Sequence, residues 1–476
     1  MNNYDFAVQI AKKVNEIGGT TYFVDGCVRD SLLGIPNKDI DIEIHNVTPY
    51  ILENILKELG DVQSRTVGNN FGICNIDGYD LDIALPRKET AIGKGHKDFR
   101  IDVDAYLPLK DSARRRDFTI NALMENVLTG EIKDCFGGLD DLHNGIIRHI
   151  NDKTFTEDPL RVLRACQFAT RFNFKIAPET INLCKTMDLS TLPKERIAGE
   201  LTKVLLKAKK PSVFFNSLYE CKQTEWFKEI YALKGIKQDS VYHPEGDVYM
   251  HTMSVLDQAG ELFSTGIDEP DRYLPFMLSA LCHDFGKVNT TEMNNKGRLC
   301  ALNHEITGIP IANEFLNRIY NNKGFTKYVD NMIEYHMKAH SCFNNNSRTK
   351  TTNLMFDKLL YPKDFIQLVY ADSTGHDLNS LDNRQFNMFL NKAMAESEFL
   401  TDRYFDYGKK ISEPHITADD LIELGLNPSP LFKIILDKAW NMHLKGVKKE
   451  HVLKQMVNML TGDDKAELLS ALNVHN

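Results

Sequence analysis

Residues 23–34 of the chain read FVDGCVRDSLLG, and residues 39–41 follow as DID. The first stretch predicts a strand that ends at a glycine turn at Gly26 and continues directly into a helix carrying Arg29. Glycine lets the backbone approach a ligand closely, and a helix N-terminus offers unpaired N–H groups to phosphate. Alternate residues of a strand share a face, so Asp39 and Asp41 should point the same way. Two such carboxylates beside a phosphate cradle are what magnesium-dependent phosphoryl transfer requires.

The D-x-D pattern alone is more typical of a surface hairpin whose acids are solvated. A third acid bears on this choice. Two stretches of alternating hydrophobicity flank the dipeptide Asp77-Gly78, which is a strong hairpin signal. Asp82 then lies on a strand able to pair beside the strand of Asp39 and Asp41; the alternative is an edge strand that faces water.

Other sequence patterns lie before and after the stretch that carries these acids. Amphipathic periodicity predicts helices at 4–17 and 50–59, and residues 86–110 have the composition of a long functional loop. Three arginines at 114–116 run into a predicted helix. Arginine at a helix start suits a triphosphate, whereas the alternative for this run is a solvated charged face.

The bulk composition sets the class of protein. A chain of 476 residues predicts two to four domains, and 42% hydrophobic with 26% charged residues is typical of a soluble globular protein. A net charge of −9 argues against a protein that coats nucleic acid, although a local basic groove remains compatible with it. The 9 cysteines form no C-x-x-C pair, and no apolar run is long enough to span a membrane. We therefore expect a cytoplasmic protein without a membrane partner.

From residue 157 onward the periodicity is helical, beginning with EDPLRVLRACQF at 157–168. Proline suits a first helical turn, and Asp158, Arg161 and Arg164 are spaced by three, so they should line one face. One interpretation is an intrahelical ladder of ion pairs. The other is base recognition, because cytosine and adenine each present an amino donor beside a ring-nitrogen acceptor. An aspartate and an arginine together match that order and reject guanine and uracil, which present the opposite one.

These segments, with RRDFTINA at 115–122, resemble the class II tRNA nucleotidyltransferase and bacterial poly(A) polymerase family over about residues 20–235. The resemblance implies an α+β fold, with a small mixed-sheet polymerase-beta-like head followed by helical domains. It implies template-free addition of CCA to tRNA from CTP and ATP with release of pyrophosphate, and no role for DNA. Enzymes of the family that add only A, only CC, or poly(A) are the alternatives.

The resemblance also implies roles for individual residues. Asp39 and Asp41 are the catalytic residues and bind Mg²⁺, and residues 86–110 are the segment that moves between C and A addition. The nucleotide-binding residues implied by the resemblance are Gly26 and Arg29 at the triphosphate, Arg116 on the nucleotide, Asp158 and Arg161 at the base, and Arg164 as an anchor. The chain departs from the family where Asp25 replaces a glycine, Cys27 an alanine and Gln167 an arginine.

A second constellation follows in the C-terminal half. His251, the adjacent pair His283-Asp284 and the later Asp372 lie in helical contexts and resemble the core ligands of the HD phosphohydrolase superfamily over about residues 243–375. Imidazole and carboxylate together bind divalent transition metals at sites that activate water. His304 and His336 are available for a second metal position. The resemblance implies phosphatase or cyclic phosphodiesterase activity.

The resulting expectation is a head at 1–150, a helical neck that binds tRNA at 151–240, an HD domain at 241–395 and a helical C-terminal module at 396–476. The lysines of this last module suit either an RNA backbone or a solvated helix face. A different class of function makes hydrolysis of RNA ends the main activity and reduces the head to an RNA-binding module.

Overall fold

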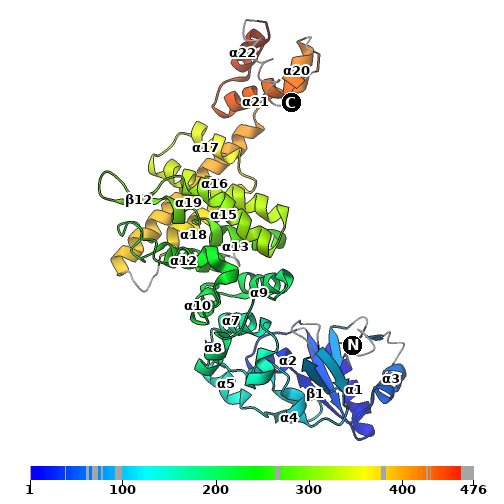
Figure 1. The fold of residues 1–476 in the computed structure, drawn as a ribbon. Coiled ribbons are helices and arrows are strands. Elements are labelled where there is room, and N and C mark those ends of the chain that lie inside the picture. The colour runs from blue at the N-terminus through cyan, green and yellow to red at the C-terminus, as the bar shows by residue number, and fades with distance from the viewer. Residues whose placement is uncertain are drawn as a thin grey trace. The chain divides into compact units, whose positions relative to one another are not determined.

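The computed structural model describes residues 2–37, 39–59, 64–66, 73–76, 79–91, 99–262, 269–376, 382–424, 427–428 and 430–461 (Figure 1). The chain divides into two compact units, Met1–Trp226 and Phe227–Asn476. The α+β class predicted from the sequence is confirmed, because one mixed sheet lies in the first unit and helices dominate the rest. Within the described part of the chain, no helix combines the length and apolar character needed to cross a membrane.

The sheet of the first unit has seven strands in the order β3-β4-β5-β2-β1-β8-β9. Only the β2–β5 pair is parallel, and the other neighbours are antiparallel. Helix α1 (Asn3–Glu16) lies against β1 and buries its apolar stripe there. The strands are β1 (Thr20–Val24), β2 (Ile40–His45), β3 (Ser64–Thr66), β4 (Ile73–Ile76), β5 (Leu81–Ala84), β8 (Met124–Asn126) and β9 (Ile132–Lys133).

The predicted pairing of the acidic strands is confirmed. β5 lies between β4 and β2, so the alternative of a water-facing edge strand is wrong. In the β2–β5 register Asp41 stands opposite Asp82, and neighbouring strands lie about 4.8 Å apart. The strand β1 leads through Asp25 into α2 (Gly26–Leu32), as the glycine turn predicted. The described strands therefore bring the end of β1 and the starts of β2 and β5 to one end of the sheet.

Two expectations for the following segment are wrong. Residues 87–91 and 99–103 are not loop but the antiparallel strands β6 (Arg87–Ala91) and β7 (Phe99–Val103); residues 92–98 lie outside the described residues. The strand β6 is polar, which conceals it, whereas β7 alternates Phe99, Ile101 and Val103 with charged residues, a strand signal that sequence reasoning overlooked. The arginine run does not begin a helix either: it follows α4 (Leu109–Ala113) and precedes the short 3-10 helix η1 (Thr119–Asn121).

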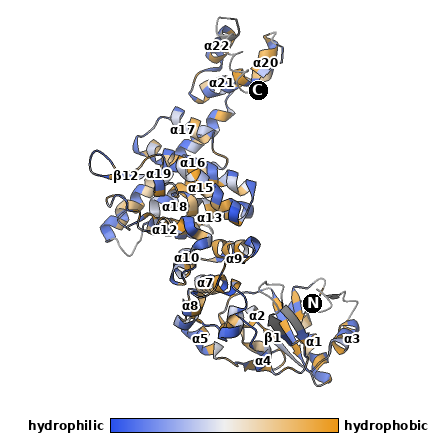
Figure 2. Cartoon of the chain, in the orientation of Figure 1, coloured by the Kyte–Doolittle hydropathy of each residue, from blue (hydrophilic) through white to orange (hydrophobic). Residues whose placement is uncertain are grey.

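The remainder of the first unit is helical, as predicted, apart from a short parallel pair of β10 (Ile146–Ile147) and β11 (Lys175–Ile176). Pro159 directly precedes α7, the position that its sequence predicted. Hydrophobic and hydrophilic residues alternate along these helices (Figure 2). The helices are α3 (Pro49–Glu58), α5 (Gly138–Asn144), α6 (Asp152–Thr156), α7 (Leu160–Phe172), α8 (Pro178–Cys184), α9 (Lys194–Lys207) and α10 (Ser212–Glu220).

The second unit is built around α13 (Tyr273–Cys282), which is buried almost all round, as expected of a central core helix. It packs against α12 (Val248–Leu262), α16 (Lys323–Asn344) and α18 (Pro362–Thr374). A short ribbon, β12 (Thr291–Met293) with β13 (Leu299–Ala301), interrupts the helices. The other helices are α11 (Lys228–Tyr231), α14 (Lys287–Thr290), α15 (His304–Ile319), α17 (Thr349–Phe356), α19 (Asn383–Ser412), α20 (Ala418–Glu423), α21 (Pro430–Leu444) and α22 (Lys449–Thr461).

The end of the described chain has a small core of its own. Buried residues of α20, α21 and α22, such as Leu421, Ile435 and Met456, form a separate hydrophobic cluster. Helix α19 runs without interruption through the expected boundary at residue 395 and leads toward this cluster. The expected division into four domains remains a prediction.

Candidate functional site

Four carboxylates gather at the end of the sheet where β1 ends and β2 and β5 begin. Asp41 is half-buried in β2, and Asp39 directly precedes this strand. Burial, and then the negative charges of Asp25 and Asp82, raise the pKa of Asp41 to about 7 despite the opposing charge of Arg116. The cluster is therefore still acidic beside the positive charge of Arg116. Because it offers only carboxylate oxygens, it suits a hard divalent cation.

The turn before α2 is tied to the acidic strand. The Cys27 thiol donates to the carbonyl oxygens of Val24 at 3.0 Å and of Asp41 at 3.6 Å. A Cβ on Gly26 would meet only the side-chain ends of Arg29 and Asn37, at 3.4 and 3.8 Å. The turn thus fixes the start of α2 beside the carboxylates.

Arg29 lies buried within the first unit. Its guanidinium donates to Asp30 Oδ1 at 2.6 Å and to Asn121 Oδ1 at 2.5 Å. It also lies over the rings of Phe168 and Phe172, at 5.0 and 4.8 Å from their centroids. These contacts join α2 to α7. The triphosphate contact implied for Arg29 remains a prediction.

Arg116 points to the carboxylate cluster. Its Nη1 donates to Asp25 Oδ2 at 2.6 Å, and its Nη2 donates to Glu43 Oε2 at 3.4 Å. Burial alone would raise the pKa of Glu43, but bonding to His45 and the charge of Arg116 hold it well below its usual range. Glu43 was missed by sequence reasoning. The signal was present, since it continues the alternation of Asp39 and Asp41 along β2.

Asp158, just before α7, and Arg161 and Arg164 within it bond to residues outside this set. The interpretation as an intrahelical ladder of ion pairs is therefore wrong. Both oxygens of Asp158 accept from Arg196, at 3.0 and 2.9 Å. The Arg161 guanidinium donates to the carbonyl oxygens of Thr154 and Arg115, both at 2.7 Å. Arg164 Nε donates to Asp117 Oδ2 at 2.6 Å. These partners hold the three side chains in place, so the side chains are oriented before a ligand binds.

Arg196 is a second residue that sequence reasoning missed. It lies in α9, in a stretch whose pattern predicted only a helix. Nothing local identifies its partner, because Asp158 lies 38 residues earlier. The bidentate geometry is that of a strong arginine–carboxylate pair.

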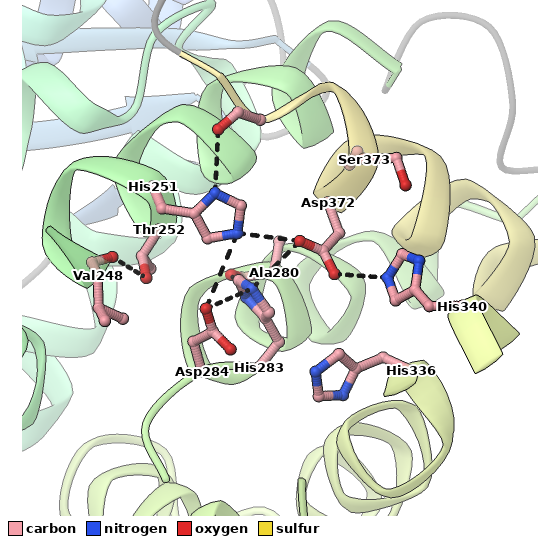
Figure 3. A network of polar contacts seen from close by, with 12 residues as sticks. Val248, His251, Thr252, Ala280, His283, Asp284, His336, His340, Asp372 and Ser373 are labelled. Carbon is pink, nitrogen blue, oxygen red and sulfur yellow. Dashed lines mark hydrogen bonds and ion pairs between the residues drawn. The ribbon is translucent and has the colours of Figure 1, made fainter. Parts of the chain in front are cut away.

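A cluster of histidines and aspartates forms in the second unit (Figure 3). His251 comes from α12, His283 and Asp284 follow α13, and Asp372 comes from α18. The ligand atoms of His251, His283 and Asp372 all lie within 4.8 Å of one another. His251 Nε2 is 3.0 Å from Asp372 Oδ1, and His283 Nε2 is 3.7 Å from the same oxygen. The structure thus brings together residues up to 121 positions apart.

Asp284, His304 and His336 form an adjoining group, with ligand atoms again within 4.8 Å. Asp284 Oδ1 is 3.2 Å from His304 Nε2, and Asp284 Oδ2 is 3.3 Å from His283 Nε2. The carboxylate therefore faces both groups. Across the described residues, His283 Nε2 is buried and makes no hydrogen bond of good geometry, and Asp284 Oδ2 is buried beside it, which fits a bound metal ion.

The charge state of the histidines depends on the neighbouring carboxylates. Burial alone lowers the pKa of His251, but Asp372 and Glu245 raise it to about 10. Burial and His304 lower the pKa of His336 to about 3. His336 is thus a neutral ligand at physiological pH, whereas a metal ion would take the place of the His251 proton.

Two buried glutamates support the cluster, and sequence reasoning missed both. Glu245 contacts Nδ1 of His251 at 2.9 Å, and also His243 and His376. Glu396 contacts His340 Nδ1 at 2.8 Å, and His340 Nε2 reaches Asp372 Oδ2 at 3.0 Å. Carboxylates behind histidine ligands fix their tautomer and orientation.

A cavity of about 530 Å³ opens on this cluster. Asp284, His304 and Asp372 line its floor, and Lys287 and Lys392 add positive charge to its walls. Lys287 Nζ lies 2.7 Å from Asp284 Oδ2. Metal-ligating groups beside lysines suit an anionic substrate such as a phosphate ester.

Comparisons with known proteins cover both units. The family model "Poly A polymerase head domain" matches residues 21–148. The chain is 39% identical to the multifunctional CCA protein of Nitrosococcus oceani over 274 residues, which is 56% of this chain and 63% of that relative, just under two thirds. It is 34% identical to the multifunctional CCA protein of Actinobacillus pleuropneumoniae serotype 5b over 382 residues, 77% of this chain and 87% of the relative. The Thermotoga maritima CCA-adding enzyme, solved in complex with tRNA CCA, has the same fold at 20% identity, with a TM-score of 0.60 over 96% of this chain and 95% of that one.

Proposed function

This chain belongs to the family of the multifunctional CCA proteins, and we propose that it adds C, C and A to the 3′ end of tRNA. CTP and ATP are the substrates, pyrophosphate is released, and no nucleic-acid template is used. The observation that carries this proposal is the register of Asp41 with Asp82 beside Arg116, which makes an acidic site next to a cation for phosphate.

We assign Asp39 and Asp41 to hold Mg²⁺, which fits their uncompensated charge. When bound, Mg²⁺ favours ionisation of the tRNA 3′-hydroxyl and offsets charge on the triphosphate. The start of α2 at Gly26 and the Arg116 guanidinium orient the phosphates. Transfer between correctly aligned groups needs no covalent enzyme intermediate.

Asp158 and Arg161 act as the template in this proposal. The Asp158 carboxylate accepts from the amino group of C or A, and Arg161 donates to the adjacent ring nitrogen. Guanine and uracil leave buried polar groups unpaired, which supports discrimination on the order of 10⁴. Arg196 and the carbonyls that bind Arg161 fix this pair before the nucleotide arrives.

Replacing Arg196 with alanine should reduce the preference for CTP and ATP over GTP and UTP by about 10²-fold, because Asp158 then loses its fixed orientation. The measurement is kcat/KM for all four nucleotides on tRNA lacking CCA. Arg148→Ala is the matched control, since Arg148 pairs with Asp141 away from α9. If Arg196→Ala prefers CTP and ATP as strongly as wild type does, Arg196 does not hold Asp158 in the orientation that selects the nucleotide.

The products formed on tRNA lacking CCA test the main proposal. We expect two added nucleotides with CTP alone and CCA with CTP and ATP together. Unlimited addition of A would identify a poly(A) polymerase instead. Addition that stops after CC, or that adds A only to tRNA already ending in CC, would identify an enzyme of narrower specificity.

We further propose that the histidine–aspartate cluster hydrolyses phosphate esters at RNA ends as an HD phosphohydrolase, with a divalent transition metal. The shared carboxylate of Asp284 favours this second function, since it faces both candidate metal groups. A nucleotidyl acceptor needs a free 3′-hydroxyl, so hydrolysis of a blocking 2′,3′-cyclic phosphate prepares tRNA for CCA addition.

The proposed functions assign a part of the chain to each step. The head at 1–150 carries nucleotidyl transfer, the neck at 151–240 binds tRNA, residues 241–395 carry hydrolysis, and 396–476 form the C-terminal module. Both reactions act on tRNA, which places the protein in the cytoplasm in this proposal.

A further inference from the structure

Asp25 adopts a backbone conformation that residues other than glycine rarely occupy. It lies between β1 and α2 with φ 61° and ψ −131°. Glycine would take this conformation without cost, whereas a side chain there is strained. Strain of this kind persists where surrounding contacts hold it, and here the contact is the 2.6 Å bond from Arg116 to the Asp25 carboxylate.

Asp25 covers the solvent-facing side of Arg116. The other oxygen atoms that Arg116 contacts belong to Glu43 and Asn121, both completely buried. The Asp25 side chain is 44% exposed, while that of Arg116 is 3% exposed. An anion that approaches Arg116 from solvent therefore meets the Asp25 carboxylate first.

The guanidinium is not fully satisfied by these partners. Across the residues that the structure describes, Arg116 Nε is buried and has no hydrogen-bond partner. A buried donor without a partner has a hydrogen bond left to offer an incoming ligand. Asp25 and an incoming phosphate would compete for the same Nη1 donor, because each needs a short charge-assisted bond to it.

We propose that Asp25 is an internal competitor of phosphate: its carboxylate occupies Arg116 in the nucleotide-free site, yields it to the triphosphate, and takes it back as pyrophosphate leaves. This inference rests on the proposed nucleotidyl transfer. It assigns a function to the residue that departs from the family pattern. The carboxylate lowers the affinity for nucleotide and pyrophosphate alike, and thereby favours product release.

The competition between Asp25 and phosphate for Arg116 sets how far the dissociation constant changes. A carboxylate that occupies Arg116 for most of the time reduces the apparent affinity of phosphate by the fraction of protein in which Arg116 is available. A single charge-assisted bond corresponds to about a tenfold change in dissociation constant. The Asp25 charge also acts on Asp41, so the carboxylate bound to Arg116 lies near the acidic cluster.

Calorimetric titration of the full chain with pyrophosphate, and separately with ATP, tests the inference in the presence of Mg²⁺ and without tRNA. No transfer occurs under these conditions, so binding is measured alone. Asp25→Asn keeps the size of the side chain, tolerates positive φ and removes the charge. We expect its dissociation constants for both ligands to fall about tenfold.

Glu43→Gln is the matched control, because Glu43 contacts Arg116 from the buried side. It should weaken binding or leave it unchanged. In an Arg116→Gln background, Asp25→Asn should have no effect, since the competition then has no target. Asp25→Gly, which removes the strain as well, should reproduce the tightening and guards against poor folding of the asparagine variant.

Three results would overturn the inference while leaving the proposed nucleotidyl transfer standing. Equal dissociation constants for wild type and both Asp25 variants would show that Asp25 does not compete with phosphate. Tightening that persists in Arg116→Gln shows a general charge effect, and weaker binding of Mg²⁺ and ATP by Asp25→Asn makes Asp25 a metal ligand. A wild-type protein that binds neither ATP nor pyrophosphate refutes the proposed nucleotidyl transfer itself, and the inference with it.

Discussion

Replacing Asp41 with asparagine should lower nucleotide incorporation by at least about 10³-fold. Asparagine keeps the size and the β2–β5 pairing but removes one of the charges that the proposed Mg²⁺ site needs. The measurement is single-turnover addition of CMP to tRNA lacking CCA, at saturating Mg²⁺. Binding of tRNA should change little, because the substituted atoms lie in the acidic cluster.

Asp80→Asn is the matched control. Asp80 is exposed and directly precedes β5. Its substitution therefore removes an acid beside β5 but none from the cluster. It should leave incorporation within about twofold of wild type, as surface substitutions usually do. Near-wild-type incorporation by Asp41→Asn would exclude the assigned metal role and favour the interpretation in which hydrolysis is the main activity.

The Asp41→Asn variant should also differ from wild type in thermal stability, in a direction that the pKa of Asp41 fixes. The pKa of Asp41 is raised to about 7 by burial and neighbouring acids, so the folded state holds a proton that the unfolded state releases near its ordinary pKa. The carboxylate therefore destabilises the fold as pH rises through this window. In metal-free buffer Asp41→Asn should melt at a higher temperature than wild type at pH 8, and the difference should vanish near pH 4.

Replacing His283 with alanine should lower metal-dependent phosphohydrolase activity by at least about 100-fold. Within the described part of the chain its Nε2 atom is buried and makes no hydrogen bond of good geometry, and it lies 3.3 Å from Asp284 and 3.7 Å from Asp372. Removal of this ligand should also reduce the metal content measured by mass spectrometry. A suitable substrate is RNA that ends in a 2′,3′-cyclic phosphate, assayed with Mn²⁺, Ni²⁺, Zn²⁺ and Mg²⁺ in turn.

Two controls separate the activities. His451→Ala removes an exposed histidine of α22 and should leave both reactions unchanged. His283→Ala itself should retain CCA addition, because the assigned nucleotidyl-transfer residues belong to the first unit. A wild-type protein without hydrolase activity in any of these metals would contradict the second proposed function.

Much of the scaffold follows from local patterns. The strand–glycine–helix order around Gly26 was predicted because apolar runs and turn residues act over short distances. The pairing of Asp82 with Asp41 was anticipated because the Asp77-Gly78 turn defines a hairpin. The β6–β7 ribbon was missed because β6 is polar and the alternation within the five residues of β7 was overlooked. The position of the arginine run after α4 was missed because short helices leave a weak periodic signal.

The sequence by itself pointed to the residues to which we assign the chemistry: the acids at the start of β2, the aspartate and arginines near α7, and the histidines and aspartates around α13. Only the tertiary structure decided how these residues are held. It joined Asp158 to Arg196 and turned Asp25 onto Arg116. Such partners are chosen by the approach of distant segments, and no local preference of either segment records that choice. Spacing along a chain fixes which face a side chain occupies, but packing fixes what it meets there.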